Sequence, residues 1–151
     1  MGRKVEFTIV GAPVAQGRPR FSNHGGFTRV YDPSKSRDAK QHIRYAAGEA
    51  MKLLDKPLEG AIHLKAQFGI PMPTSQARKR TPRPRVWRIK KPDLDNLSKT
   101  VKDGCSKVVF MDDSQIVRMT VEKIQCAQGE APFTRVLFVE LDELISSDAS
   151  S

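Results

Sequence analysis

The 151-residue chain has only two cysteines, Cys105 and Cys126, which lie far apart without CxxC spacing. A disulfide framework or a zinc site needs more cysteines in closer groups, so we expect neither and predict two buried thiols. No run of about eighteen apolar residues occurs, and the N-terminus lacks the apolar segment of a signal peptide. The sequence therefore predicts a cytoplasmic protein without a membrane span.

Acidic residues are scarce in the first part of the chain. Residues 1–92 hold 20 Lys or Arg against 6 Asp or Glu, whereas residues 93–151 hold 6 against 11, and together they give a net charge of +9. A basic surface of this kind attracts polyanions, and nucleic acid is the commonest polyanion in a cytoplasm. The charge distribution therefore favours a nucleic-acid partner and leaves the gathered acids to be explained.

The hydrophobic pattern predicts one α/β (α+β) domain over residues 1–145, with a mixed sheet and two main helices. Alternating apolar residues predict strands at 4–11, 61–70, about 115–123 and 133–141, with a short strand around 27–31. Apolar residues at helical spacing predict helices over 36–54 and from residue 93 to at least 104. The Ser-rich residues 146–151 are expected to be a disordered tail.

Residues 71–92 form a segment rich in proline and cations. It holds four prolines before Pro92 and eight Lys or Arg residues, so it is predicted to be an irregular loop. Its cations either bind nucleic-acid phosphates or only solvate the loop, and Trp87 either stacks on an unpaired base or anchors the loop in the core. The candidate phosphate-binding residues here are Arg78, Lys79, Arg80, Arg83, Arg85, Arg88, Lys90 and Lys91.

The stretch "IKKPDLDNLSKTVKDG", residues 89–104, places two aspartates directly after the basic segment. In a structural interpretation, Asp93 caps the following helix and Asp95 interacts with the helix dipole. Lys99 and Asp103 then continue an ion-pair ladder along the same polar face.

A second acidic pair, Asp112 and Asp113, follows the apolar residues of "VVFMDDSQIV". The "DDSQ" segment is typical of a tight turn, but "VVF" also resembles the end of a strand. If the preceding helix packs back on that strand, the two acidic pairs share a cleft. Two carboxylates ~4 Å apart repel by roughly 4 kcal/mol at an effective dielectric of 20, so the cluster would need a hard cation such as Mg²⁺.

The combination of "KPDLDNLSKTVKDG" and "VVFMDDSQIV" resembles the RusA family of Holliday-junction resolvases, as do "GRPRF" and "YDPSK" earlier in the chain. The likeness runs from about residue 17 to residue 123. It implies a homodimeric, Mg²⁺-dependent endonuclease, with Mn²⁺ as a candidate substitute and without an organic cofactor. Such an enzyme nicks two opposed strands of a four-way DNA junction, in the setting of recombination, repair or prophage processing.

The resemblance also implies roles for single residues. Asp93, Asp95 and Asp113 match the metal-binding carboxylates, and Lys99 matches the essential lysine. We expect Asp113 to be the ligand and Asp112 to support it or to be a further ligand, since neighbouring side chains on a strand alternate between its faces. Arg18 and Arg20 either bind phosphate or pair with the acids.

Three questions stay open at this stage. The chain is a junction resolvase, another Mg²⁺-dependent nuclease on the same scaffold that acts on flaps or RNA, or a nucleic-acid-binding protein without catalysis. Either one or two metal ions act. The dimer surface is either the Ala-rich helix at 36–54 or an edge strand.

Overall fold

The computed structural model describes residues 2–17, 20–24, 27–31 and 34–144, without the side chains of residues 18–33. The expected tail at 146–151, Arg18 and the side chain of Arg20 therefore lie outside the described part of the chain. The predictions made for them stay predictions.

Five strands form one mixed sheet in the order β1-β7-β4-β6-β5. Strands β4 and β6 are parallel, whereas β1 with β7, β4 with β7 and β5 with β6 are antiparallel. With the two helices, this sheet confirms the predicted α+β fold class. The strands span Lys4–Val10 (β1), Ile62–Ile70 (β4), Val86–Trp87 (β5), Ile116–Gln125 (β6) and Phe133–Glu140 (β7).

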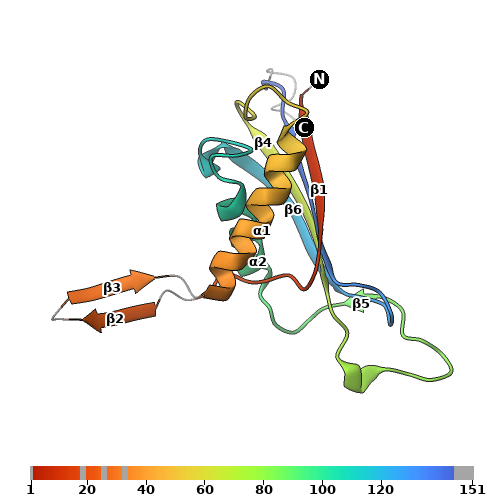
Figure 1. Cartoon of the computed structure of the whole chain (residues 1–151). Coiled ribbons are helices and arrows are strands. Elements are labelled where there is room, and N and C mark those ends of the chain that lie inside the picture. Colours follow the sequence, from red (N-terminus) through yellow and green to blue (C-terminus); the bar gives the residue numbers. More distant parts are fainter. Residues whose placement is uncertain (1, 18–19, 25–26, 32–33, 145–151) are drawn as a thin grey trace.

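Both helices lie on the same face of the sheet (Figure 1). Alternation along β4 explains this arrangement, because Leu64, Ala66 and Phe68 are buried on that face while Lys65 points to the polar face. Helix α1 spans Ser34–Met51 and α2 spans Leu94–Cys105. Helix α1 therefore begins and ends earlier than its apolar spacing predicts.

The two helices make close contact near the end of α2. A Cβ atom on Gly104 would lie 2.7 Å from Ile43 Cγ2, so only glycine allows α1 to approach this closely. Arg44 of α1 then donates from Nε to the Gly104 carbonyl (3.2 Å) and from Nη2 to the Asp103 carbonyl (3.2 Å). A cation at this end also complements the helix dipole, so α1 fixes where α2 ends.

A β-hairpin projects away from the sheet (Figure 1). It pairs β2 (Arg20–His24) with β3 (Phe27–Tyr31), which confirms the short strand predicted at 27–31, whereas no strand is predicted where β2 lies. Two hydrogen bonds hold the chain just before it: Gly17 N–H donates to Ser36 Oγ (2.8 Å) and Gln16 N–H donates to the Asn96 carbonyl (2.9 Å). The chain at Gln16 and Gly17 is thus attached to the start of both helices.

Residues 106–112 contain a turn in place of the predicted strand, so that prediction is wrong. Lys107 has a positive φ of 68°, and its N–H donates to the Phe110 carbonyl (2.7 Å). Val109 and Phe110 are fully buried, so this apolar segment reaches the core from a turn. As a consequence, Asp112 and Asp113 come before strand β6 and do not end a strand.

The two cysteines are free and buried, as predicted. Burial raises the pKa of both thiols.

Candidate active site

Asp93 and Asp95 lie at the beginning of α2. Asp93 occupies the N-cap position with extended backbone angles, but its side chain accepts no capping hydrogen bond. The capping explanation for Asp93 is therefore wrong. Both aspartates are exposed, and neither side chain has a hydrogen bond or ion pair within the described part of the chain. Their carboxylates are available to a ligand.

Lys99 lies one helical turn beyond Asp95 and is exposed. The expected ion-pair ladder does not form, because Asp103 Oδ2 lies 3.4 Å from Lys40 Nζ of α1. Among the residues with described side chains, Lys99 has no ion pair. Lys99 and Asp95 thus lie one helical turn apart among the exposed residues at the beginning of α2.

The segment leading into Asp93 is tied to the end of β6. Lys123 Nζ donates to the carbonyls of Lys90 (2.8 Å) and Pro92 (2.7 Å). Arg88 reinforces this link, since its Nη1 donates to Gln125 Oε1 at 3.0 Å. Sequence reasoning missed Lys123. The signal was available, because this lysine stands at a position of the strand whose side chain points toward the helices.

Asp112 and Asp113 lie in a turn at the beginning of β6, as one interpretation of "DDSQ" predicts. The 3-10 turn η2 spans Asp113–Gln115, and the Asp112 carboxylate accepts from Ser114 N–H at 2.9 Å. This hydrogen bond lowers the pKa of Asp112. Asp113 is exposed. Asp112 thus holds the turn, whereas the Asp113 carboxylate faces solvent.

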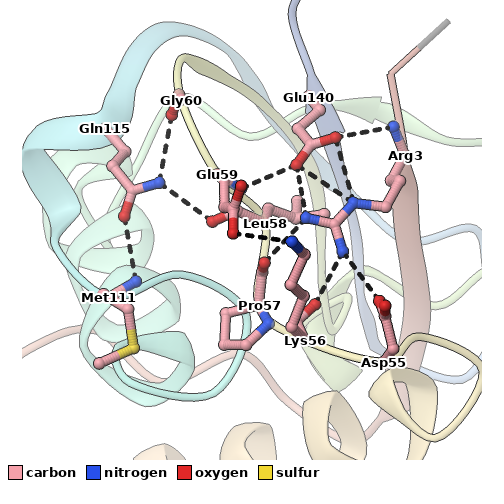
Figure 2. Close-up of polar contacts among 10 residues, drawn as sticks. All are labelled: Arg3, Asp55, Lys56, Pro57, Leu58, Glu59, Gly60, Met111, Gln115 and Glu140. Atoms are coloured by element: carbon pink, nitrogen blue, oxygen red, sulfur yellow. Dashed lines mark hydrogen bonds and ion pairs between the residues drawn. The ribbon is translucent and has the colours of Figure 1, made fainter.

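Gln115 anchors this turn and was missed by sequence reasoning (Figure 2). Its Oε1 accepts from the N–H groups of Met111 (3.0 Å) and Asp112 (3.1 Å). Its Nε2 donates to the carbonyls of Leu58 and Gly60, each at 3.1 Å. One amide side chain therefore ties the acidic turn to the loop before β4.

The two acidic pairs do not meet within one chain, so the cleft expected there is not formed. Asp93 and Asp113 lie beyond opposite ends of α2, whose 12 residues span roughly 18 Å. Strand β6 gives a second measure of this separation. The acidic turn lies just before Ile116, whereas the residue that contacts the Pro92 carbonyl is Lys123, seven residues or roughly 23 Å further along the strand. Across the described residues, no three His, Cys, Asp or Glu side chains are close enough to hold a metal ion together.

The start of α2 alone nevertheless fits a hard cation. Mg²⁺ is usually held by one or two carboxylates together with water and substrate phosphate. Asp93 and Asp95 supply two exposed carboxylates of this type. The donor set is therefore suitable for Mg²⁺ in the presence of a phosphate, although a third protein ligand is missing.

Residues 71–92 are largely irregular, as predicted, apart from the 3-10 turn η1 (Thr74–Gln76) and the short strand β5. Gln128 holds this loop in place, since its Oε1 accepts from the N–H groups of Arg78 (3.0 Å) and Arg83 (3.1 Å). Gln128 Nε2 in turn donates to the Arg78 carbonyl at 2.8 Å. The loop is thus attached to the turn between β6 and β7.

The cations of this loop fall into two groups. Three guanidinium groups take part in structure: Arg83 donates to the Gln76 carbonyl, Arg88 to the Lys91 carbonyl and Arg85 to Glu130. The other cations are exposed: Arg78, Lys79, Arg80, Lys90 and Lys91.

Trp87 is 69% exposed on β5, so the interpretation that it anchors the loop in the core is wrong. Its ring is accessible at the surface beside the exposed cations.

The described helices include none that is long and apolar enough to cross a membrane. The family described as Endodeoxyribonuclease RusA matches residues 11–135, which include both acidic pairs, Lys99 and the basic loop. The chain is also 32% identical over 142 residues to "Uncharacterized protein YqaN" of Bacillus subtilis (strain 168), a similarity that covers 91% of this chain and 96% of that protein. The match confirms the resemblance seen in the sequence motifs: the chain belongs to the endodeoxyribonuclease RusA family.

Proposed function

We propose that this protein is a Mg²⁺-dependent endodeoxyribonuclease that resolves four-way DNA junctions by nicking two opposed strands, and that it acts as a homodimer. The observation that carries the proposal is the pair of exposed carboxylates, Asp93 and Asp95, at the beginning of α2, free of any described protein partner. Family membership supports the nuclease class. A homodimer supplies two equivalent sites for two strands by symmetry.

Asp93 and Asp95 are the residues that would hold the metal ion. When bound, Mg²⁺ lowers the pKa of water and neutralises charge on the scissile phosphate. Lys99, one turn along the same helix, orients the phosphate or stabilises charge that develops on its oxygens. Asp112 holds the turn that carries Asp113 through its hydrogen bond to Ser114, so we assign it a supporting role beside the ligands.

The exposed cations of the basic loop bind the DNA backbone in this proposal. They lie on the segment that runs directly into Asp93, so phosphates bound there are brought to the carboxylates. Trp87 offers an exposed ring on which an unpaired base at the centre of a junction stacks. Arg18 and Arg20 are further candidates, since the chain before them is attached to α2 at Asn96.

The test compares cutting of a four-way junction, a Y-shaped DNA, a linear duplex and a single-stranded RNA, each in Mg²⁺, Mn²⁺ and EDTA. We expect symmetric nicks in the junction that require the divalent ion, with little cutting of the duplex. Asp95→Asn should reduce nicking at least about 100-fold while junction binding stays within about twofold, because only the metal site is changed.

Asp103→Asn is the matched control, since Asp103 lies on the same helix but pairs with Lys40. It should cut like the wild type. Equal cutting of junction and duplex would refute junction specificity. Preferred cutting of the Y-shaped DNA or of RNA would assign a different nuclease on the same scaffold. Binding without any cutting would identify a non-catalytic nucleic-acid-binding protein.

A further inference from the structure

In the part of the chain that the structure describes, no helix or strand covers one face of the sheet. Both helices pack on the opposite face, and the hairpin of β2 and β3 projects away from the sheet (Figure 1). The remaining face carries Lys65 and every second residue of β1, β7, β4 and β6, and we call it the uncovered face. Its exposed cations outnumber its exposed acids, since they are Lys4, Lys65, Arg118 and Arg135 against Glu6 and Glu122.

Three of these cations form a diagonal line across the central strands β7, β4 and β6. Lys65 lies opposite Leu137 and Thr120 in the pairing registers. Arg135 lies one step ahead of it on β7 and Arg118 one step behind it on β6, and such diagonal neighbours are about 7–8 Å apart. Among the residues with described side chains, none of the three cations has an ion pair. A line of cations of this kind tracks the backbone of a nucleic-acid strand, which carries one phosphate per nucleotide.

An aromatic ring holds Arg135 in place. The guanidinium carbons of Arg135 and Arg85 each lie 5.5 Å from the centroid of the Phe133 ring. Gly69 makes room for this ring, because a Cβ atom there would lie 2.4 Å from Phe133 Cε1. Arg85 also donates to Glu130 (3.0 Å), whereas Arg135 has no hydrogen bond among the described residues. Stacking therefore positions Arg135 and leaves its N–H groups for a ligand.

A hollow of about 310 Å³ opens on the uncovered face beside the second and third cations of the line. Leu137 gives its lining an aliphatic side chain, and Gln67, Thr120 and Glu122 give it hydrogen-bonding groups. A nucleobase needs this combination, since its faces are apolar and its edges donate and accept. The carboxylates of Glu6 and Glu122 repel a phosphate but accept from the amino group of a base. The hollow therefore suits a base, and the line of cations suits the phosphates.

The uncovered face leads to the candidate active site around one edge of the sheet. Trp87 pairs with Ile124, so the register places it on this face, where it is 69% exposed. The chain then crosses to the side of the helices, where Lys123 Nζ donates to the Pro92 carbonyl (2.7 Å) directly before Asp93. A DNA strand that crosses the uncovered face and passes Trp87 thus reaches the carboxylates around this edge.

We propose that the uncovered face binds a single-stranded segment of DNA, with backbone phosphates on Arg118, Lys65 and Arg135 and one unpaired base in the hollow beside Glu122. The choice of DNA as the ligand rests on the proposed function. The site lies on the other side of the sheet from the beginning of α2, so it holds a part of the substrate away from the bond that is cut. It favours branched DNA, because only an opened strand can place a base in the hollow.

Binding titrations test this site without cleavage. The full chain is titrated in EDTA against a fluorescent single-stranded DNA of about 20 nucleotides and against a duplex of the same sequence. Lys65→Ala combined with Arg118→Ala should weaken single-strand binding at least about fivefold. The slope of log affinity against log salt should become shallower by about 1.4, which is about 0.7 for each lost phosphate contact. Duplex binding should change by no more than about twofold.

The matched control is Lys52→Ala combined with Lys56→Ala. It removes the same charge, but these lysines lie after α1 and pair with Glu49 and Glu59. The control should bind the single strand like the wild type. Unchanged single-strand binding in the Lys65 and Arg118 variant, or an equal loss in the control, would overturn the proposed site.

Photo-cross-linking of the wild type locates the bound strand and needs no variant to fold. A single-stranded DNA with 5-iodouracil bases is irradiated with the protein, and the modified peptides are identified by mass spectrometry. We expect cross-links within residues 62–70, 116–125 or 133–140. Cross-links confined to residues 71–105 would overturn the proposed site.

The outcomes also separate this site from the proposed function. A wild-type protein that cuts junctions in Mg²⁺ but fails either binding test would leave the proposed function standing without this site. A wild-type protein that passes both binding tests but cuts no DNA in Mg²⁺ would overturn the proposed function and leave the uncovered face as a site for single-stranded DNA.

Discussion

The ion pair between Arg3 and Glu140 joins the beginning of β1 to the end of β7 (Figure 2). Arg3 Nη2 lies 2.7 Å from Glu140 Oε2, and the backbone N–H of Glu59 donates to the same oxygen at 2.7 Å. The hydrogen bond from Arg3, opposed by partial burial, lowers the pKa of Glu140 from 4.5 to about 2. The ionised carboxylate is therefore more favourable in the folded protein than in the unfolded chain.

This shift predicts how stability depends on pH. Because the pKa is lower in the folded state, the stabilisation is complete above about pH 4.5 and is lost as the pH falls toward 2. The full shift corresponds to at most about 3.4 kcal/mol at pH 7 and about 1.4 kcal/mol at pH 3. Since the side chain is 16% exposed, solvent screening reduces both values.

The assay is urea unfolding of the wild type and of Glu140→Gln at pH 7, 5, 4 and 3, followed by far-UV circular dichroism. We expect the difference in unfolding free energy to shrink by about 1–2 kcal/mol between pH 7 and pH 3. Glu59→Gln is the control, because the Glu59 carboxylate forms its ion pair with exposed Lys56 and such pairs contribute about 0–1 kcal/mol. A difference that stays constant or grows as the pH falls would refute the reasoning.

Three further predictions concern the candidate site. Lys123→Met removes two hydrogen bonds to backbone carbonyls. It should destabilise the fold by about 2 kcal/mol in urea unfolding and reduce junction nicking at least tenfold, whereas Lys123→Arg should retain more of the stability and of the nicking activity. Gln115→Ala frees the acidic turn from the loop before β4, and we expect about 1–2 kcal/mol of destabilisation and slower nicking at unchanged junction affinity. Replacing residues 78–80 with alanine removes three exposed cations, so the slope of log affinity against log salt should become shallower by about 2–3 in binding titrations.

Local patterns predicted most of the elements. Strands β1, β4, β6 and β7 follow from alternation because one face of the sheet is buried under the helices and the other is polar. Pro92 and the aspartates after it predict where α2 begins. Leu97 and Val101 mark the buried face of this helix, so the aspartates, which lie off that face, are predicted to be exposed.

Contacts that depend on backbone groups far away in the chain were not predictable. Nothing in the sequence pattern shows that Gln115 bonds to Leu58 or that Lys123 bonds to Pro92, because these contacts use carbonyl groups that every residue has. The segment at Val109 and Phe110 has strand-like composition, but its side chains reach the core from a turn. Because this turn was interpreted as a strand, the sequence analysis placed Asp112 and Asp113 at the end of a strand, whereas they lie before the beginning of β6.

The attachment of Gln16 to Asn96 has a consequence for how substrate is positioned. Gln16 contacts the first turn of α2, and strand β2 of the projecting hairpin begins shortly after it in the chain, at Arg20. Under the proposed function, a nucleic-acid strand bound along the hairpin would lie at a set distance from Asp93 and Asp95. Inserting or deleting residues between Gln16 and β2 should therefore shift the position of the cut along the DNA by whole nucleotides.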